Sequence, residues 1–359
     1  MHTFLYRLRG RALPSDILSL VETLAEYKGR QNDFGRTRPE TLDVLYETVS
    51  AQSTAASGEI EGIHIPPERL KVLMALAGTP HGRPEEEIAG YRDALRGISG
   101  IGVGAMTIIS PDELVTPETI LRLHATLYRY TASPNAGRWK AKNNVIEARY
   151  EGGEALGIAF VPPAAAVTPQ FMNALCEELA RAREEKVAPT LILTANFVLD
   201  FLCIHPFDDG NGRVARLLAH LLLTREGYTV GRYVPLERFI LETKDAYYAA
   251  LRESSSGWHD KVHDPDYWTR YFLNMLLRAY KEIEVRLRSI SESRDHLGAL
   301  IRDAAMSRGE FAVSDLQAAM PRASRAYIYR VLRDMLNENH LRRLSRGRYA
   351  VSTGCTVTD

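Results

Sequence analysis

The sequence predicts a mainly α-helical protein, and its apolar pattern and composition support this fold class. Apolar residues recur at spacings of three and four along most of the 359 residues, whereas few segments alternate with the period of two that marks a strand. Hydrophobic residues make up 45% of the chain and charged residues 25%, which is typical of a soluble globular protein. The length is sufficient for two or three domains.

Composition excludes several broad classes of function. The formal net charge is zero, so any nucleic-acid-binding surface must be local. No apolar run approaches the length of a membrane span, and residues 1–7 lack the apolar core of a signal peptide. Three scattered cysteines (Cys176, Cys203 and Cys355) are too few for a disulfide framework or a zinc site. We therefore expect a cytoplasmic protein with no membrane partner.

Residues 1–110 form the first predicted unit, a helical region. An amphipathic helix covers 17–28, and a second begins near Pro39 and runs to Gly62, where glycine favours a helix end. Two more helices are predicted over 68–77 and 84–98, before a glycine-rich break.

Residues 111–292 form the second predicted unit. Thr116 is a typical N-cap, and the apolar face of the helix that follows it includes His124, which we expect to be a packed structural histidine. The apolar spacing predicts further helices over 171–184, 190–201, 214–223 and 266–290. Thr168 is expected to cap the first of these helices.

One segment of this unit breaks the helical pattern. Residues 144–150 and 158–160 read as short strands that flank Gly152-Gly153, so a β-hairpin is predicted there. Pro162-Pro163 ends the hairpin.

The most chemically distinctive segment joins the helices 190–201 and 214–223. Its glycines, Gly210 and Gly212, permit a tight turn because glycine adopts positive φ freely. A glycine-rich turn that opens a helix directs several backbone N–H groups and the positive end of the helix at one point, which is typical of an anion site.

Four charged or titratable side chains accompany this anion site. Arg213 and Arg216 lie three residues apart on one helix face, His205 is a candidate base, and Asp209 is a candidate ligand for a hard cation. Together these groups indicate phosphoryl or nucleotidyl transfer. The simpler alternative, a histidine-capped turn between two core helices, explains the glycines but not the convergent arginines and Asp209.

Residues His205 to Arg216 read His-Pro-Phe-x-Asp-Gly-Asn-Gly-Arg-x-x-Arg, which resembles the signature of Fic-domain proteins with every fixed position filled. The resemblance extends over roughly 50–290 and includes residues 87–91, the hairpin and residues 247–251. It implies a compact Fic-type helical bundle with a β-hairpin flap over the active site. The implied activity is transfer of AMP from ATP to a hydroxyl side chain of a target protein.

The resemblance also implies roles for individual residues. His205 corresponds to the general base, and Phe207 to a residue that packs inward. Asp209 corresponds to the ligand of Mg²⁺ (or Mn²⁺). The expected nucleotide-binding residues are Gly210, Asn211 and Gly212 for the α- and β-phosphates, Arg213 for the β-phosphate side, Arg216 for the γ-phosphate, and Tyr247 and Tyr248 beside the adenine. The tyrosine pair has an alternative role as part of the core.

The predicted flap includes Asn144, Val145 and Ile146, which correspond to the strand that positions the target segment by β-augmentation. Lys140 stands where the family pattern leads us to expect arginine, and we expect this departure to affect a peripheral contact only.

The segment Ser57-x-x-x-Glu61-Gly62 resembles the autoinhibitory helix of Fic proteins. Glu61 is expected to pair with Arg216 in the space that the γ-phosphate needs. The ordinary alternative is an acidic helix end followed by a glycine cap. Glu61 could instead align a water for removal of AMP, which leaves a de-AMPylating or bifunctional enzyme as an alternative activity.

Residues 293–359 form the third predicted unit. Helices over 297–306, around Ser314 and over 324–337, followed by strands 341–344 and 349–351, resemble a winged helix-turn-helix. Residues 299–352 hold ten arginines and no lysine against five acidic residues. The arginines on or near the third helix and the hairpin that suit phosphate contact are Arg322, Arg325, Arg330, Arg333, Arg346 and Arg348.

DNA is the candidate partner of residues 297–353, and docking to another protein is the alternative. A nucleotide-sensing DNA-binding regulator is the corresponding alternative function. The partners expected of the enzyme are ATP and a target protein. The sequence leaves open whether the chain forms a homodimer.

Overall fold

The computed structural model describes residues 8–37, 39–76, 78–100, 109, 113–149, 155–292, 296–320 and 323–352. The predicted mainly α-helical class is confirmed within these ranges. Three expectations lie outside the described residues: the Gly152-Gly153 turn, Arg322, and the unit boundaries near 110 and 293. None of the described helices combines the length and apolar character needed to cross a lipid bilayer.

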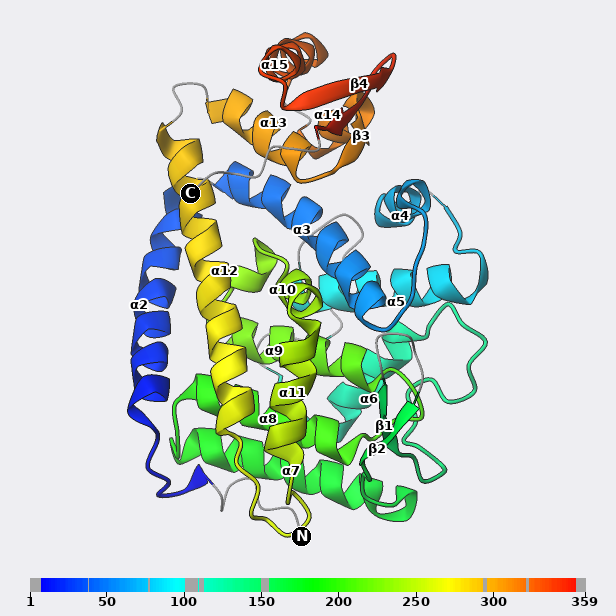
Figure 1. Ribbon diagram of the computed structural model, residues 1–359, viewed down its shortest axis with the longest axis vertical. Coiled ribbons are helices and arrows are strands. Elements are labelled where there is room, and N and C mark those ends of the chain that lie inside the picture. Colours follow the sequence, from blue (N-terminus) through cyan, green and yellow to red (C-terminus); the bar gives the residue numbers. More distant parts are fainter. Residues whose placement is uncertain are drawn as a thin grey trace.

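Two helices occupy the middle of the larger body, and the others surround them (Figure 1). The central pair is α8 (Thr190–Ile204) and α9 (Asn211–Arg225). The surrounding helices are α2 (Ser15–Thr37), α3 (Pro39–Ile60), α4 (Pro67–Met74), α5 (Gly82–Ser99), α6 (Pro117–Leu127), α7 (Thr168–Glu184), α10 (Leu236–Glu242), α11 (Lys244–Ser255) and α12 (Asp266–Glu292), with short 3₁₀ turns η1 (Ala165–Val167) and η2 (Val230–Arg232).

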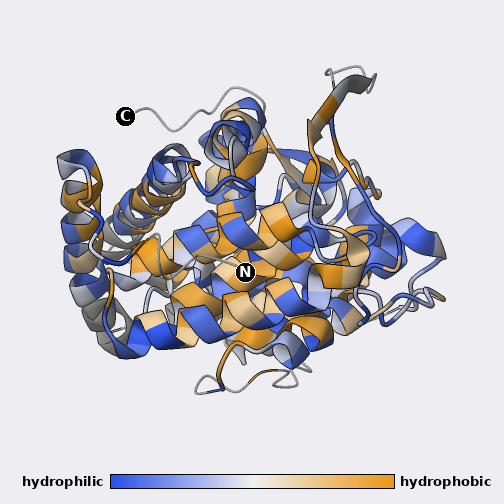
Figure 2. Ribbon diagram, turned by 90° about the horizontal axis from the view of Figure 1, so that it is seen from below, coloured by the Kyte–Doolittle hydropathy of each residue, from blue (hydrophilic) through white to orange (hydrophobic). Residues whose placement is uncertain are grey.

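The helix α8 is apolar on nearly every side, which explains its central position, because only a fully buried helix can be apolar all round. One hydrophobic cluster extends from Leu8 to Ile283 and includes side chains from both the first and the second predicted units. Figure 2 shows hydrophobic residues concentrated in the helices near the middle of the view. The two units therefore share one core.

The predicted helix starts at two threonines have different outcomes. Thr116 is an N-cap as expected, since its hydroxyl accepts a hydrogen bond from the N–H of Thr119 at 3.2 Å. The expectation for Thr168 was wrong, because Val167 is the N-cap of α7 and Thr168 is its first residue. The hydroxyl of Thr168 donates to the carbonyl of Ala164 at 3.1 Å, so the preceding turn of 3₁₀ helix uses it.

The predicted hairpin is present and consists of β1 (Ile146–Arg149) and β2 (Ala155–Phe160). The strands are antiparallel, with Ile146 opposite Phe160 and Ala148 opposite Gly157. The first strand starts two residues later than predicted, so Asn144 and Val145 precede it.

The C-terminal unit has its own core, separate from the main cluster. Its elements are α13 (His296–Met306), β3 (Glu310–Ala312), α14 (Val313–Ala319), α15 (Arg325–Asn337), β4 (Leu341–Ser345) and β5 (Arg348–Val351). The sheet order is β3-β5-β4, so the predicted two-stranded hairpin gains a third strand that the sequence did not reveal. The winged-helix assignment stays a prediction.

This unit lies against α3 (Figure 1). The side chain of Gln52, in the middle of α3, donates to the carbonyl of Ser307 at 2.7 Å. A second contact joins Lys71 of α4 to Asp315 of α14 at 3.6 Å. The C-terminal unit therefore touches the same helix that carries Ser57.

Candidate active site

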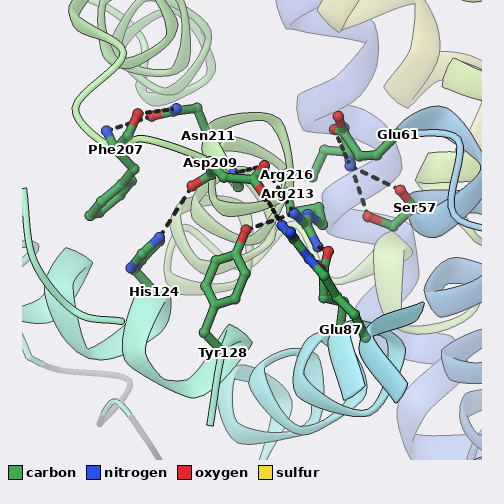
Figure 3. A network of polar contacts seen from close by, with 12 residues as sticks. Ser57, Glu61, Glu87, His124, Tyr128, Phe207, Asp209, Asn211, Arg213 and Arg216 are labelled. Carbon is green, nitrogen blue, oxygen red and sulfur yellow. Dashed lines mark hydrogen bonds and ion pairs between the residues drawn. The ribbon is translucent and has the colours of Figure 1, made fainter. Parts of the chain in front are cut away.

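The turn between α8 and α9 is built around a buried phenylalanine. Phe207 is fully buried, as expected, and its ring stacks on His124 with 3.8 Å between centroids. Asn211 accepts a hydrogen bond from the N–H of Phe207 at 2.9 Å and donates to its carbonyl at 2.8 Å (Figure 3). The Asn211 side chain thus closes the turn, and its backbone N–H and the second N–H of its amide remain to meet an anion.

His124 supports the turn from below, which confirms the expectation of a packed histidine. Its Nδ1 accepts a hydrogen bond from the N–H of Gly137 at 2.9 Å, so Nε2 carries the proton and donates to the carbonyl of Asp209, 3.2 Å away. Burial lowers the pKa of His124 to about 4. The ring is therefore neutral at pH 7.

This burial predicts acid sensitivity of the fold. The unfolded chain binds a proton on His124 near the ordinary histidine pKa of 6.5, while the folded chain does so only near 4, so stability falls as the pH drops through that window. Between pH 7 and pH 5 the free energy of unfolding should lose about 2 kcal/mol through this residue. In urea titrations at the two pH values, His124→Gln should show a drop that is smaller by about that amount. An equal loss of unfolding free energy in both proteins would show that His124 does not cause the pH dependence.

His205 ends α8 in the left-handed conformation, with φ of 49°. Its Nδ1 lies 3.2 Å from the carbonyl of Leu202, which can only accept, so Nδ1 carries the proton and Nε2 keeps its lone pair. Burial lowers the pKa of His205 to about 4, and the charge of Lys140 acts in the same direction. At neutral pH this ring is an uncharged base with a defined free nitrogen.

Lys140 and Asn144 fasten the hairpin to the same turn. The Lys140 ammonium donates to the carbonyl of Ile204 at 3.1 Å and to Asn144 Oδ1 at 2.8 Å. The Asn144 amide donates to the carbonyls of His205 and Phe207 at 3.3 and 3.1 Å. The expectation that Lys140 makes only a peripheral contact was wrong, since its side chain is buried beside the turn.

Arg213 is buried at the start of α9 and is held by partners on other elements. Its guanidinium contacts the carboxylate of Glu87, donates to the hydroxyl of Tyr128 at 2.8 Å and lies 3.3 Å from Asp209 Oδ1 (Figure 3). Gly210, with φ of 82°, sits against Tyr128, and a β-carbon there would lie 2.9 Å from the tyrosine hydroxyl. A larger residue than glycine would therefore displace Tyr128.

Arg216 is also buried, and the end of α3 engages its guanidinium. It donates to Ser57 Oγ at 3.0 Å, to the Ser57 carbonyl at 3.1 Å and to Glu61 Oε1 at 2.8 Å. A β-carbon on Gly212 would collide with Glu61 Oε1, so the carboxylate lies directly against the first turn of α9. The structure thus brings Ser57 and Glu61 together with Arg216, and Gly62 follows the helix end with φ of 77°.

Asp209 is one of two exposed acids of the turn, beside Asp208, and 54% of its side chain is accessible. Partial burial opposes ionisation of its carboxyl, but the charge of Arg213 and the N–H of Gly210 keep the pKa below the usual value, so it is ionised at neutral pH. No group of three or more histidine, cysteine or acidic side chains suited to a metal occurs among the described residues. A single carboxylate nevertheless fits Mg²⁺, which is commonly held by one or two carboxylates and the phosphates of a substrate.

The predicted adenine residues lie on α11, where Tyr247 lines the same small cavity as Arg216. Tyr247 is buried and its ring meets Trp268 and Tyr271 at centroid distances of 5.6 and 5.7 Å, as in the core alternative. Tyr248 is 44% exposed. Their contact with adenine stays a prediction, as does target docking by Val145 and Ile146.

Among the residues that contact the turn or Arg213, several were not assigned a site role from the sequence, including Arg83, Glu87, Tyr128 and Lys140. The buried acid Glu87 could have been found, since Arg83, Glu87 and Tyr91 fall at helical spacing and an acid on a buried face demands a basic partner. The spacing of four indicates Arg83 as one partner, but nothing in the local sequence indicates the second, Arg213.

Comparison with known proteins identifies the central segment. Residues 114–223 match the model of the Fic/DOC family. "Protein adenylyltransferase Fic" of Nematostella vectensis is 25% identical over 188 residues, and "Probable protein adenylyltransferase" of Aquifex aeolicus is 28% identical over 146 residues. These alignments cover 52% and 41% of this chain, which spans 40% and 39% of the respective relatives.

Two solved structures share the fold. A Fic family protein from Desulfovibrio desulfuricans G20 has a TM-score of 0.60 at 21% identity, over 98% of this chain and 99% of that one. Fic-1 from C. elegans has a TM-score of 0.55 at 18% identity, over 74% of this chain and 70% of that one. The mainly helical architecture with a small hairpin is therefore one that Fic proteins have.

Proposed function

We propose that this chain, which carries a Fic/DOC-type domain in residues 114–223, transfers AMP from ATP to a hydroxyl side chain of a target protein. The observation that carries the proposal is the free Nε2 of His205 beside the first turn of α9, where backbone N–H groups and two arginines converge. The names of the relatives support the same activity.

The first turn of α9 would receive the triphosphate, because its unpaired N–H groups and its positive end favour an anion. Arg213 and Arg216 would neutralise the phosphates through charge-assisted hydrogen bonds. Mg²⁺ held by Asp209 would offset further negative charge as the reaction proceeds.

His205 Nε2 would take the proton of the incoming hydroxyl. The hydroxyl oxygen then forms a bond to the α-phosphorus, the bond from that phosphorus to the bridging oxygen of the β-phosphate breaks, and pyrophosphate leaves. The Nδ1 hydrogen bond to Leu202 fixes the ring in the tautomer that this step requires.

The hairpin would position the target. Within the described residues β1 pairs only with β2, so its other edge is available to an extended peptide. Asn144 and Lys140 connect the start of this strand to the carbonyls around His205. A peptide added to β1 would therefore be held in a fixed relation to the base.

We further propose that the contact between Glu61 and Arg216 keeps the enzyme inactive. The γ-phosphate of ATP needs the guanidinium that Glu61 and Ser57 now engage. A carboxylate against the first turn of α9 would also repel the phosphates electrostatically. The α-phosphate of a nucleotide bound in this state would be displaced from in-line attack.

The reaction itself can be tested by the position of the label. Purified Glu61→Gly protein, which lacks the proposed inhibitory carboxylate, would be incubated with Mg²⁺ and ATP that is radiolabelled on either the α- or the γ-phosphate. AMP transfer labels protein from α-labelled ATP only. Transfer of the γ-label would instead indicate a kinase and refute the proposal.

A second candidate function, binding of duplex DNA, is favoured by the surface of the C-terminal unit. Arg325, Tyr329 and Arg333 follow one another at spacings of four, so they share one exposed face of α15. The turn between β4 and β5 adjoins this face, since a β-carbon on Gly347 would lie 3.6 Å from the Tyr329 hydroxyl. Helix and turn thus form one basic surface, with Arg346 exposed in the turn.

Replacing Arg325, Arg330 and Arg333 together by alanine should weaken duplex binding and make the slope of log affinity against log salt shallower by roughly 1 per arginine. Arg302→Ala is the matched control, because Arg302 lies on α13 and pairs with Glu338 at 2.6 Å. Fluorescence anisotropy with a labelled duplex measures both quantities. Equal affinity and equal salt slope in the triple variant and the native protein would show that this surface does not bind DNA.

A further inference from the structure

Four side chains of alternating charge form a closed ring around the turn. Arg83 donates to Asp209 Oδ2 at 2.7 Å and also pairs with Glu87. Glu87 in turn pairs with Arg213 (Figure 3). Arg213 lies 3.3 Å from Asp209 Oδ1 and so completes the ring. The members come from the N-terminal half of α5, from the turn and from α9.

The ring has a buried half and an exposed half. The side chains of Glu87 and Arg213 are each 4% accessible, whereas those of Asp209 and Arg83 are 54% and 70% accessible. The exposed half borders a cavity of about 430 Å³ whose lining includes Arg83, Tyr128, Asp208 and Asp209. Glu87 and Arg213 are therefore fixed in place, while Arg83 can move into solvent at little cost.

The two oxygens of Asp209 differ in how they are engaged. Oδ1 accepts from the N–H of Gly210 at 2.7 Å and faces Arg213, so it is tied to the turn. Oδ2 is held by Arg83. Oδ2 is therefore the oxygen that a cation can approach without disturbing the turn, and the Arg83 guanidinium beside it would repel that cation.

We propose that Arg83 is the counter-ion of Asp209 in the cation-free protein, and that it competes with the divalent cation for Oδ2. The inference rests on the proposed function, since it takes Asp209 as the ligand of the nucleotide's metal. Glu87 lowers the free-energy cost of displacing Arg83 from Asp209, because Arg83 keeps the Glu87 carboxylate as a partner. Glu87 is thus a positioning residue for both arginines.

The expected size of the effect of Arg83 on cation binding follows from the high solvent exposure of its side chain. An accessible ion pair contributes little, and repulsion between a dication and a nearby guanidinium is weakened by water. Removal of Arg83 should therefore strengthen the effect of the metal on nucleotide binding by roughly threefold to tenfold.

The test compares nucleotide affinities and needs no turnover. Dissociation constants of a non-hydrolysable ATP analogue are measured by calorimetry without metal and with Mn²⁺, and their ratio reports how strongly the metal supports binding. All proteins carry Glu61→Gly so that Arg216 is available. Arg83→Ala should raise this ratio by roughly threefold to tenfold, and Arg122→Ala, an exposed arginine paired with Glu113, should leave it unchanged.

A double-mutant cycle assigns the effect to Asp209. In an Asp209→Asn background, Arg83→Ala should no longer change the ratio. An unchanged or lower ratio in Arg83→Ala alone, or the same rise in the Asp209→Asn background, would overturn the role of Arg83. Failure of the Glu61→Gly protein to bind the analogue at all would count against the proposed nucleotide transfer instead.

Discussion

Replacing His205 by alanine is expected to lower AMP transfer by roughly three orders of magnitude, within the range that a general base contributes. The lost group is the Nε2 lone pair, which the hydrogen bond from Nδ1 to Leu202 leaves free. Nucleotide affinity should stay within about threefold of the native value, because the phosphates are held by α9 and its arginines. Both quantities are best measured in the Glu61→Gly background, by label incorporation and by calorimetry.

Two further variants make this expectation specific. His205→Asn keeps a donor for the Leu202 carbonyl but has no basic nitrogen, and it should be as inactive as the alanine variant. His340→Ala changes a histidine of the C-terminal unit and should be fully active. Label incorporation at the native rate in His205→Asn would show that another group accepts the proton.

The pH dependence provides an independent check on the same residue. Since burial lowers the pKa of His205 to about 4, the base stays unprotonated well below neutrality. The rate of the Glu61→Gly form should therefore change little between pH 8 and about pH 6, where an ordinary histidine with a pKa near 6.5 would already be losing activity.

Replacing Glu61 by glycine is expected to raise AMP incorporation, including self-modification, by roughly tenfold to a hundredfold. An energetic difference of about 1.4–2.8 kcal/mol is sufficient for such a change, and a buried arginine that loses a competing carboxylate can supply it. The change frees the guanidinium of Arg216 and removes the carboxylate from the first turn of α9. Incorporation of α-labelled AMP measures the gain.

Glu59→Gly is the matched control for this experiment. Glu59 is an exposed residue in the last turn of α3, two positions before Glu61, so this variant introduces a glycine at nearly the same place without touching Arg216. It should label no faster than the native protein. An equal gain in both variants would mean that loosening of the helix end, and not loss of the Glu61 carboxylate, activates the enzyme.

The sequence predicts contacts well where one short segment contains all the information. Ser57 and Glu61 are four residues apart, so they share a helix face, and the structure shows both on Arg216. Gly210 and Phe207 likewise specify the turn, because a positive φ and an apolar ring between two helices leave few alternatives. The same expectation for Gly212 was wrong, since this residue lies in the first turn of α9 without a positive φ, and its lack of a side chain instead leaves room for Glu61.

Contacts between distant segments could not be predicted in this way. Arg83 and Glu87 each reach a partner 126 residues away, and which base an acid on α5 meets depends on how α5 packs against α9. The sequence suggested that Lys140 makes only a peripheral contact. The group that it contacts, the carbonyl of Ile204 at the end of α8, is distant in sequence, so no local pattern reveals it. The docking of the C-terminal unit on α3 joins two predicted units by surface contacts that leave no local pattern.

The helix α3 packs against α5 and α10, yet its buried face is partly polar. Its buried face includes Ser50, Ser53 and Thr54, and within the described part of the chain their hydroxyls have no hydrogen-bond partner. Each such group costs about 1–3 kcal/mol, so α3 has less to lose than an apolar helix when it shifts.

Gln52, which holds the C-terminal unit, is nine residues before Glu61, about 13 Å along the helix axis. If Glu61 excludes the γ-phosphate as proposed, a ligand of that unit that favours a shift of α3 away from Arg216 would raise the affinity for ATP. By thermodynamic reciprocity, ATP would raise the affinity for that ligand by the same factor.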